Sequence, residues 1–266
     1  MFSYRDICKQ TCTQKHDIRI DDIITKREFE LPFSDESYHL SYAPVGNYPF
    51  DPLVIISGKT TSGDSSDLFK EELLKNNDLY GACVKSIFSN MKERLFIYLR
   101  EIELFGYLKK YLDFWKTSDY EGQWNKIFTS PQESIKSGIQ VTQAFNCAIL
   151  NKDRHKRSSQ PPKRIFNKIY NEIGCMFKHF NITNNLKLII FLDTPGSLSS
   201  FHQIDYWEKS DYKNTDVKII SITHPSTQNS VIYNNISNLY ALSDSNRKKK
   251  RAIKLLEKAK ETIKNL

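Results

Sequence analysis

Four short runs of apolar, largely β-branched residues recur along the chain, at residues 53–56, 139–142, 186–192 and 217–222. The last two contain few polar residues, which is typical of strands buried on both faces of a parallel sheet. Apolar residues at helical spacing occupy the segments between and after them, at 84–112, 162–180 and 253–266. This alternation predicts an α/β fold, a three-layer α/β/α arrangement around a central four-stranded parallel sheet with right-handed crossovers.

No internal repeat and no composition break divides the chain, so we expect one α/β domain over residues 46–266, preceded by an N-terminal extension over residues 1–45. Aromatic residues make up 12% of the chain, which excludes a disordered protein. No stretch approaches the roughly 18 uncharged apolar residues that a membrane span needs. The five cysteines are an odd number, and no apolar run follows the first charges. We therefore expect a cytoplasmic monomer with reduced thiols and no membrane partner.

Polar and turn-forming residues directly follow each of the four apolar runs. The segments are 57–64, 143–147, 193–196 and 223–226. Ligands of open parallel sheets bind outside the carboxyl ends of the strands. The sequence thus predicts that these four segments converge on one edge and form the functional site there.

Gly58-Lys59-Thr60 matches the end of a phosphate-binding P-loop, but that motif needs a glycine five residues earlier, where this chain has Leu53. The loop after the first strand is therefore either a flexible tight turn or an active-site loop of another type.

His224 begins the sequence His224-Pro225-Ser226 after the last strand. A lone histidine is more often structural, but a neutral imidazole at a strand end can donate a hydrogen bond to charge that develops on a leaving group.

The net charge of +8 is concentrated in two segments. Residues 247–266 hold nine Lys and Arg against two Glu, and residues 152–168 hold seven against one Asp. A localised charge of this kind suits contact with nucleic-acid phosphates, although a basic run is also often a solvated helix face. The candidate DNA-contacting residues are Arg154, Lys156, Arg157, Lys248 and Lys249.

The order and spacing of these features resemble the uracil-DNA glycosylase superfamily over roughly residues 50–240. Four features carry the resemblance: the strand and glycine-bounded loop at 54–63, Phe88 with the following helix from Arg94 to Leu104, the segment 141–147, and the last two strands ending in His224-Pro225-Ser226.

The resemblance implies a monofunctional DNA glycosylase that flips a nucleotide out of the stack and hydrolyses its N-glycosidic bond, leaving an abasic site. Phe88 and Gln143, with Gly58 and Ser226, would hold the base, and the loop from Ser226 would press into the DNA. His224 would stabilise the departing base. The role would be DNA repair or defence against modified viral DNA.

The chain departs from this family's pattern at two positions. Lys59 stands where the family often has a water-positioning acid or Asn, so Asp64 or Asp67 would supply the carboxylate, or Lys59 would act as an amine nucleophile. Gln143 replaces an Asn, so we expect an unusual, damaged or modified base rather than uracil.

The family's iron–sulfur branch needs four cysteines, and only an altered spacing of Cys8, Cys12, Cys147 and Cys175 would provide them. We therefore expect no cofactor and no metal, with ordinary reduced thiols at these positions.

Two other functions fit the same sequence. One is a catalytically silent module that binds DNA or a partner protein on the same fold. The other is a hydrolase or transferase that acts on a small nucleotide in the same strand-end pocket.

Overall fold

The computed structural model describes residues 28–30, 38–43, 45–47, 51–87, 91–151, 163–168, 170–171, 176–177, 179–193, 202–214, 216–225, 232, 236 and 247–266. The statements that follow concern these residues. Six strands form one sheet: β1 (Glu28–Glu30), β2 (Tyr38–Tyr42), β3 (Val54–Thr61), β4 (Ile139–Asn151), β5 (Leu188–Asp193) and β6 (Lys218–Thr223).

The sheet confirms the predicted parallel core and extends it. The strand order is β1-β2-β4-β3-β5-β6, and the four neighbouring strands β4, β3, β5 and β6 are parallel to one another. They correspond to the four apolar runs of the sequence. The strands β1 and β2 add an antiparallel pair beyond β4. They fall within residues 1–45, so this part of the expected extension joins the same sheet as the domain.

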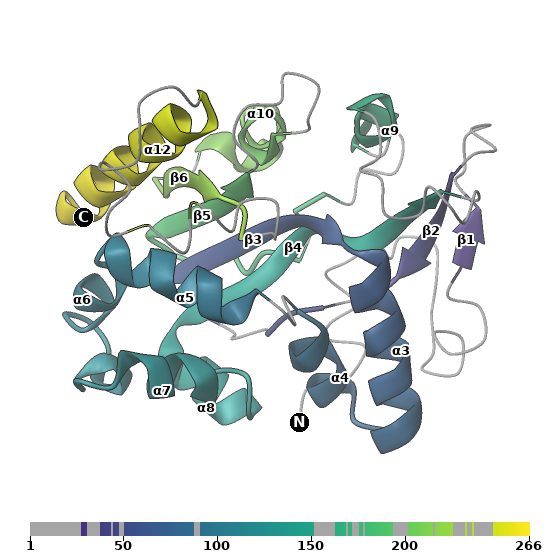
Figure 1. Ribbon diagram of the computed structural model, residues 1–266, viewed down its shortest axis with the longest axis horizontal. Helices are drawn as coiled ribbons and strands as arrows, with labels where there is room; N and C mark the ends of the chain where they lie inside the picture. Colours follow the sequence, from purple (N-terminus) through teal and green to yellow (C-terminus); the bar gives the residue numbers. More distant parts are fainter. Residues whose placement is uncertain are drawn as a thin grey trace.

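Helices cover both faces of the sheet, which gives the predicted three layers (Figure 1). On one side lie α9 (Lys163–Lys168), α10 (Gln203–Trp207) and α12 (Arg247–Lys264). On the other lie α3 (Gly63–Asn76), α4 (Leu79–Ser86), α5 (Lys92–Glu101), α6 (Leu104–Leu108), α7 (Tyr120–Lys126) and α8 (Pro131–Ser137). Two short 3₁₀ helices occupy Asp113–Trp115 and Asp211–Asn214. No helix in the described part of the chain is both long and apolar enough to cross a membrane.

The core follows from the hydrophobic pattern of the strands. All six residues of β5 are buried, as expected for a strand covered on both faces. An aromatic cluster fills each helical layer. In one layer the ring centroids of Phe105 and Trp115 lie 4.9 Å apart, and in the other those of Phe177 and Trp207 lie 5.4 Å apart. The stripe of α12 buries Leu256, as its spacing predicts.

The expected helix over residues 162–180 does not reach its predicted end. Residues 163–168 form α9 and residues 170–171 are π-helical, whereas Phe177 has a left-handed backbone with φ of 66°. Its N–H donates to the carbonyl oxygen of Ala144 at 2.8 Å. Packing against Phe191 and Trp207, together with this bond to β4, overrides the helical periodicity of the segment.

His179 is buried in this region without a polar partner for its ring. It is 1% exposed, and neither ring nitrogen has a hydrogen bond in the described structure. Its ring packs edge-on against Phe180, while its backbone carbonyl accepts a hydrogen bond from Gln140 Nε2 at 2.9 Å. Burial lowers the pKa of His179 to about 3, so the ring is neutral in the folded protein.

We expect acid to destabilise the protein through His179. Below the unfolded-state pKa near 6.5, the unfolded chain takes up a proton that the folded chain excludes, so the free energy of unfolding falls by about 2 kcal/mol between about pH 7 and about pH 5. Replacement by phenylalanine removes this contribution. Urea unfolding of the wild type and His179→Phe at both pH values measures the difference, and equal pH dependence in the two proteins would contradict it.

Candidate active site at the carboxyl edge of the sheet

The strand order places a topological switch point between β3 and β5. From β3 the chain moves to β4 on one side, and from β5 it moves to β6 on the other side. Such a reversal is where open parallel sheets bind ligands, beyond the carboxyl ends of the strands. Ser57 of β3 is level with Phe191 of β5, so Lys59 and Asp193, two residues further on, lie side by side and face the same layer.

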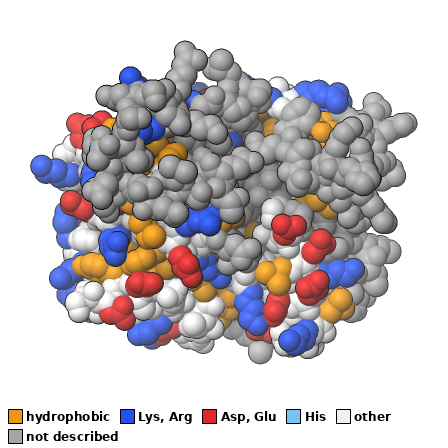
Figure 2. Space-filling model, in the orientation of Figure 1, with side chains coloured by type: hydrophobic (Ala, Val, Ile, Leu, Met, Phe, Trp, Pro, Cys, Tyr) orange, Lys and Arg blue, Asp and Glu red, His pale blue; other side chains and the backbone are white. Residues whose placement is uncertain are grey.

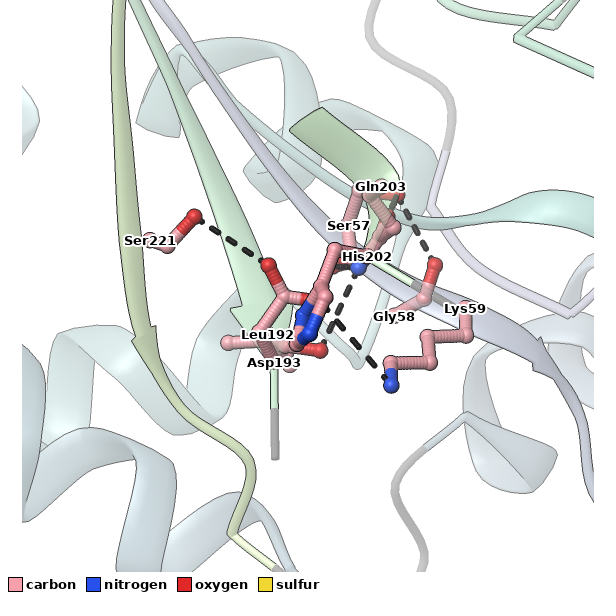
Figure 3. A network of polar contacts seen from close by, with 8 residues as sticks. All are labelled: Ser57, Gly58, Lys59, Leu192, Asp193, His202, Gln203 and Ser221. Atoms are coloured by element: carbon pink, nitrogen blue, oxygen red, sulfur yellow. Dashed lines mark hydrogen bonds and ion pairs between the residues drawn. The ribbon is translucent and has the colours of Figure 1, made fainter. Parts of the chain in front are cut away.

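Asp193 is the centre of a polar network at this switch point (Figure 3). Its Oδ2 accepts a hydrogen bond from Ser221 Oγ at 3.1 Å, and the backbone N–H of Gln203 also donates to the carboxylate. Its Oδ1 lies 3.9 Å from His202 Nδ1 and 4.0 Å from Lys59 Nζ. Oδ1 has no hydrogen bond in the described structure, although it is shielded from solvent. One carboxylate oxygen therefore faces an imidazole and an amine.

Ser57 and Gln203 hold this arrangement in place. Ser57 Oγ donates to Gln203 Oε1 at 2.8 Å. Gln203 Nε2 donates to the carbonyl oxygens of Ser57 at 3.0 Å and Leu192 at 3.2 Å. These bonds tie the first residue of α10 to both β3 and β5, and they thereby set the position of His202, the residue before the helix.

Burial moves the pKa values of the pair toward each other. Desolvation lowers the pKa of the Lys59 amine, against the carboxylate of Asp193, and the positive charge of Arg251 lowers it further. Desolvation raises the pKa of Asp193, against the charges of Lys59 and His202. The proton that joins the pair is therefore held less firmly by the amine than in water.

His224 lies at the carboxyl end of β6, where its backbone N–H donates to the carbonyl oxygen of Asp193 at 2.7 Å. The residue as a whole is half-buried, but the surrounding protein desolvates the ring. This desolvation, followed by the charge of Lys59, lowers the pKa of His224 to about 4. Because of this low pKa, the imidazole is neutral at pH 7. The next residue is fixed from the opposite layer, because Arg94 of α5 donates to the carbonyl oxygen of Pro225 at 3.4 Å.

Gln143 lies on the other face of the sheet from Lys59. Gly58 is level with Gln143, and a Cβ atom on Gly58 would lie 2.0 Å from Gln143 Oε1. The two positions therefore share a face, and Lys59, the next residue along β3, faces the opposite one. Gln143 is 5% exposed, and its Oε1 has no hydrogen bond among the described residues. The missing side chain of Gly58 makes room for this carboxamide.

The structure places His224 directly after β6, as expected, but Gly58 and Lys59 lie inside β3 and Gln143 lies inside β4. The prediction of a loop directly after the first apolar run is therefore wrong, because β3 continues to Thr61.

Asp64 is exposed in the first turn of α3 and has no hydrogen bond or ion pair with any described residue. Lys249 is 5% exposed, and its Nζ is buried rather than displayed on the surface of α12. Lys248 is described only as part of the α12 backbone.

Several predicted positions lie outside the described residues, namely Phe88, Ser226, Arg154, Lys156, Arg157, Cys8, Cys12 and Cys175. For Cys147 only the backbone, in β4, is described. Cys83 is a buried free thiol. Within the described part of the chain, no three His, Cys, Asp or Glu side chains gather into a possible metal site.

Two residues of the network carry weak sequence signals. Asp193 directly follows the apolar run 186–192, so it is among the polar residues expected at the carboxyl edge of the sheet. No motif distinguishes it from the turn residues beside it. His202 lies nine positions after β5 ends, and no motif surrounds it. Only the fold brings it to the carboxylate.

Comparisons with known proteins do not assign the site. No protein-family model matches the chain, and neither a curated protein nor a solved structure matches it. The functional argument therefore rests on the chemistry of the residues at this edge.

We expect Gly58→Ala to displace the Gln143 carboxamide, because the new Cβ and Oε1 cannot both keep their positions. Overpacking of this kind costs about 1 kcal/mol or more, and the cost should vanish in a Gln143→Ala background. Urea unfolding of the four proteins of this double-mutant cycle measures the coupling. Gly106→Ala is the control, since the Cβ that it adds would meet no neighbouring atom within 4 Å. Equal costs of Gly58→Ala in both backgrounds would contradict the proposed contact.

Proposed function

We propose that the protein is a DNA glycosylase that flips an unusual, damaged or modified base out of DNA and hydrolyses its N-glycosidic bond. The observation that carries this proposal is the neutral imidazole of His224 beside the Lys59–Asp193 pair, at the switch point beyond which open parallel sheets bind their ligands.

His224 supplies the electrophilic group. A neutral imidazole can donate a hydrogen bond to the negative charge that develops on the base as the bond to the sugar breaks. A pKa of about 4 keeps the ring neutral over the physiological range. The backbone bond to Asp193 and the bond from Arg94 to Pro225 restrict the movement of this segment, which favours a preorganised donor.

Asp193 supplies the carboxylate for the attacking water. Asp64 is the carboxylate proposed from sequence, but its exposed position and lack of described partners make it the weaker candidate. Asp193 Oδ1 is free of hydrogen bonds in the described structure and lies between Lys59 and His202. A carboxylate at this point can orient a water and stabilise positive charge on the sugar.

Gln143 supplies the base contact. Its Oε1 is a buried acceptor without a described partner, so a base that presents an N–H group would satisfy it.

The DNA contact rests on the basic segment around Arg154, Lys156 and Arg157, outside the described residues. On the face in Figure 2, the described basic and acidic side chains are interspersed. That part of the surface offers no track of a single charge for DNA phosphates.

One observation favours a second function, a binding module without catalysis. Lys59 Nζ and Asp193 Oδ1 are both shielded from solvent, which also suits a purely structural ion pair. Salt-dependent DNA binding without base release would select this function.

The test uses single- and double-stranded oligonucleotides that carry uracil, hypoxanthine, xanthine or modified pyrimidines, with abasic sites revealed by alkaline cleavage. We expect His224→Ala to lower the rate of base release by about 10²–10⁴-fold. His179→Phe is the control, because His179 contacts Gln140 near the opposite ends of the strands. Bound DNA with no base released from any substrate would contradict the proposal, as would full activity in His224→Ala.

A further inference from the structure

We propose that Lys59 is a covalent amine catalyst, whose Nζ condenses with the sugar aldehyde of an abasic site and so gives the protein a second, strand-cleaving activity. The inference rests on the proposed function in one respect, since the abasic sugar is the product that base release would leave. It extends the single hydrolytic activity expected from the sequence.

The amine of Lys59 lacks a hydrogen-bond partner in the described structure, although the residue is only 8% exposed. Its nearest charged partner, Asp193 Oδ1, lies at 4.0 Å, beyond hydrogen-bond distance. A buried ammonium in this state is costly, so the site favours a neutral amine with an available lone pair.

Two other partly buried lysines show the contrast. The Nζ of Lys92 donates to the carbonyl oxygen of Val84 at 2.9 Å and lies over the ring of Phe128. The Nζ of Lys260 lies 2.6 Å from Glu101 Oε1. Each of these amines is committed to a structural contact, whereas Lys59 Nζ points toward Asp193 without a hydrogen bond in the described structure (Figure 3).

The charges and the burial around Lys59 also favour a free amine. Burial and the positive charge of Arg251 both lower the pKa of Lys59, which increases the fraction of free amine. Asp193 opposes this effect as a carboxylate, but burial raises its own pKa and thereby makes it a better proton acceptor. A lysine in such surroundings can act as a nucleophile toward a carbonyl carbon.

The chemistry balances with the groups present. The free amine adds to the C1′ aldehyde, a C–N bond forms, and the oxygen takes up protons and leaves as water, which yields an iminium ion. Loss of the C2′ proton then forms the C2′=C3′ bond and expels the 3′ phosphate with its electron pair. Water hydrolyses the iminium ion, releases an unsaturated aldehyde and restores Lys59. No oxidant or reductant takes part.

His202 and Asp193 are the groups available to move these protons. The His202 side chain is 18% exposed, so it is more accessible than Lys59 or Asp193, and its Nδ1 lies 3.9 Å from Asp193 Oδ1. An imidazole oriented by a buried carboxylate can accept the C2′ proton. The same carboxylate therefore serves the amine and the imidazole.

The experiment incubates the protein with an oligonucleotide that already carries an abasic site, in the presence of sodium borohydride, which reduces an iminium ion to a stable amine. We expect a protein–DNA adduct that peptide mapping locates at Lys59. Lys59→Arg keeps the charge without the nucleophilic amine and should reduce the adduct by at least about 100-fold. Lys92→Arg is the control and should retain it.

The mapping in the wild type keeps the test decisive if Lys59→Arg fails to fold. An adduct at another lysine, or none, would overturn the role of Lys59. Because the abasic site is made beforehand, the result is independent of base release. Base release without an adduct at Lys59 overturns this inference alone, whereas an adduct at Lys59 without base release overturns the proposed glycosylase alone.

Discussion

A carboxylate buried at the end of the central strand β5 needs partners, and much of the carboxyl edge of the sheet is organised to provide them. The Asp193 carboxylate lies near Lys59 of β3 and accepts a hydrogen bond from Ser221 of β6. At the start of α10 it accepts a hydrogen bond from the backbone N–H of Gln203 and lies near His202. The backbone carbonyl of Asp193 holds the N–H of His224. Desolvation penalises the charged carboxylate, and each of these contacts offsets part of that penalty. The groups with catalytic potential therefore share one electrostatic centre.

Much of the fold could be predicted from the sequence, because the strands that build it are unusually apolar. A run such as Leu188 to Leu192 has no plausible place outside a sheet covered on both faces, and the structure buries all of it. β1 and β2 carried no comparable signal. They are short and pair antiparallel at one end of the sheet, and neither contains a continuous apolar run.

The positions of the candidate site residues could likewise be predicted from the sequence only in part. The place of His224 directly after a strand could be predicted, because strand ends meet at one edge. The sequence predicts a loop at Lys59, but β3 continues through this residue to Thr61. The separation of Lys59 from Gln143 could not be predicted, since it depends on the pairing of Gly58 with Gln143, and a shift of one residue would reverse it. His202 could not be predicted either, because no local pattern links a histidine before a five-residue helix to a carboxylate on a strand.

The pairing of β2 with β4 has a consequence for how the chain folds. Tyr42 pairs with Cys147 and Tyr38 with Asn151, so β2 leaves the ribosome more than a hundred residues before its partner exists. Local helices on the α3 to α8 side can form early, but the outer strands must wait until the polypeptide has returned to them. Loops of this length close slowly and raise the contact order of the protein. The antiparallel end of the sheet therefore cannot join the parallel core until β4 has been made, and the pairing of β3 with β5, which joins Val54 to Leu188, closes a still longer loop.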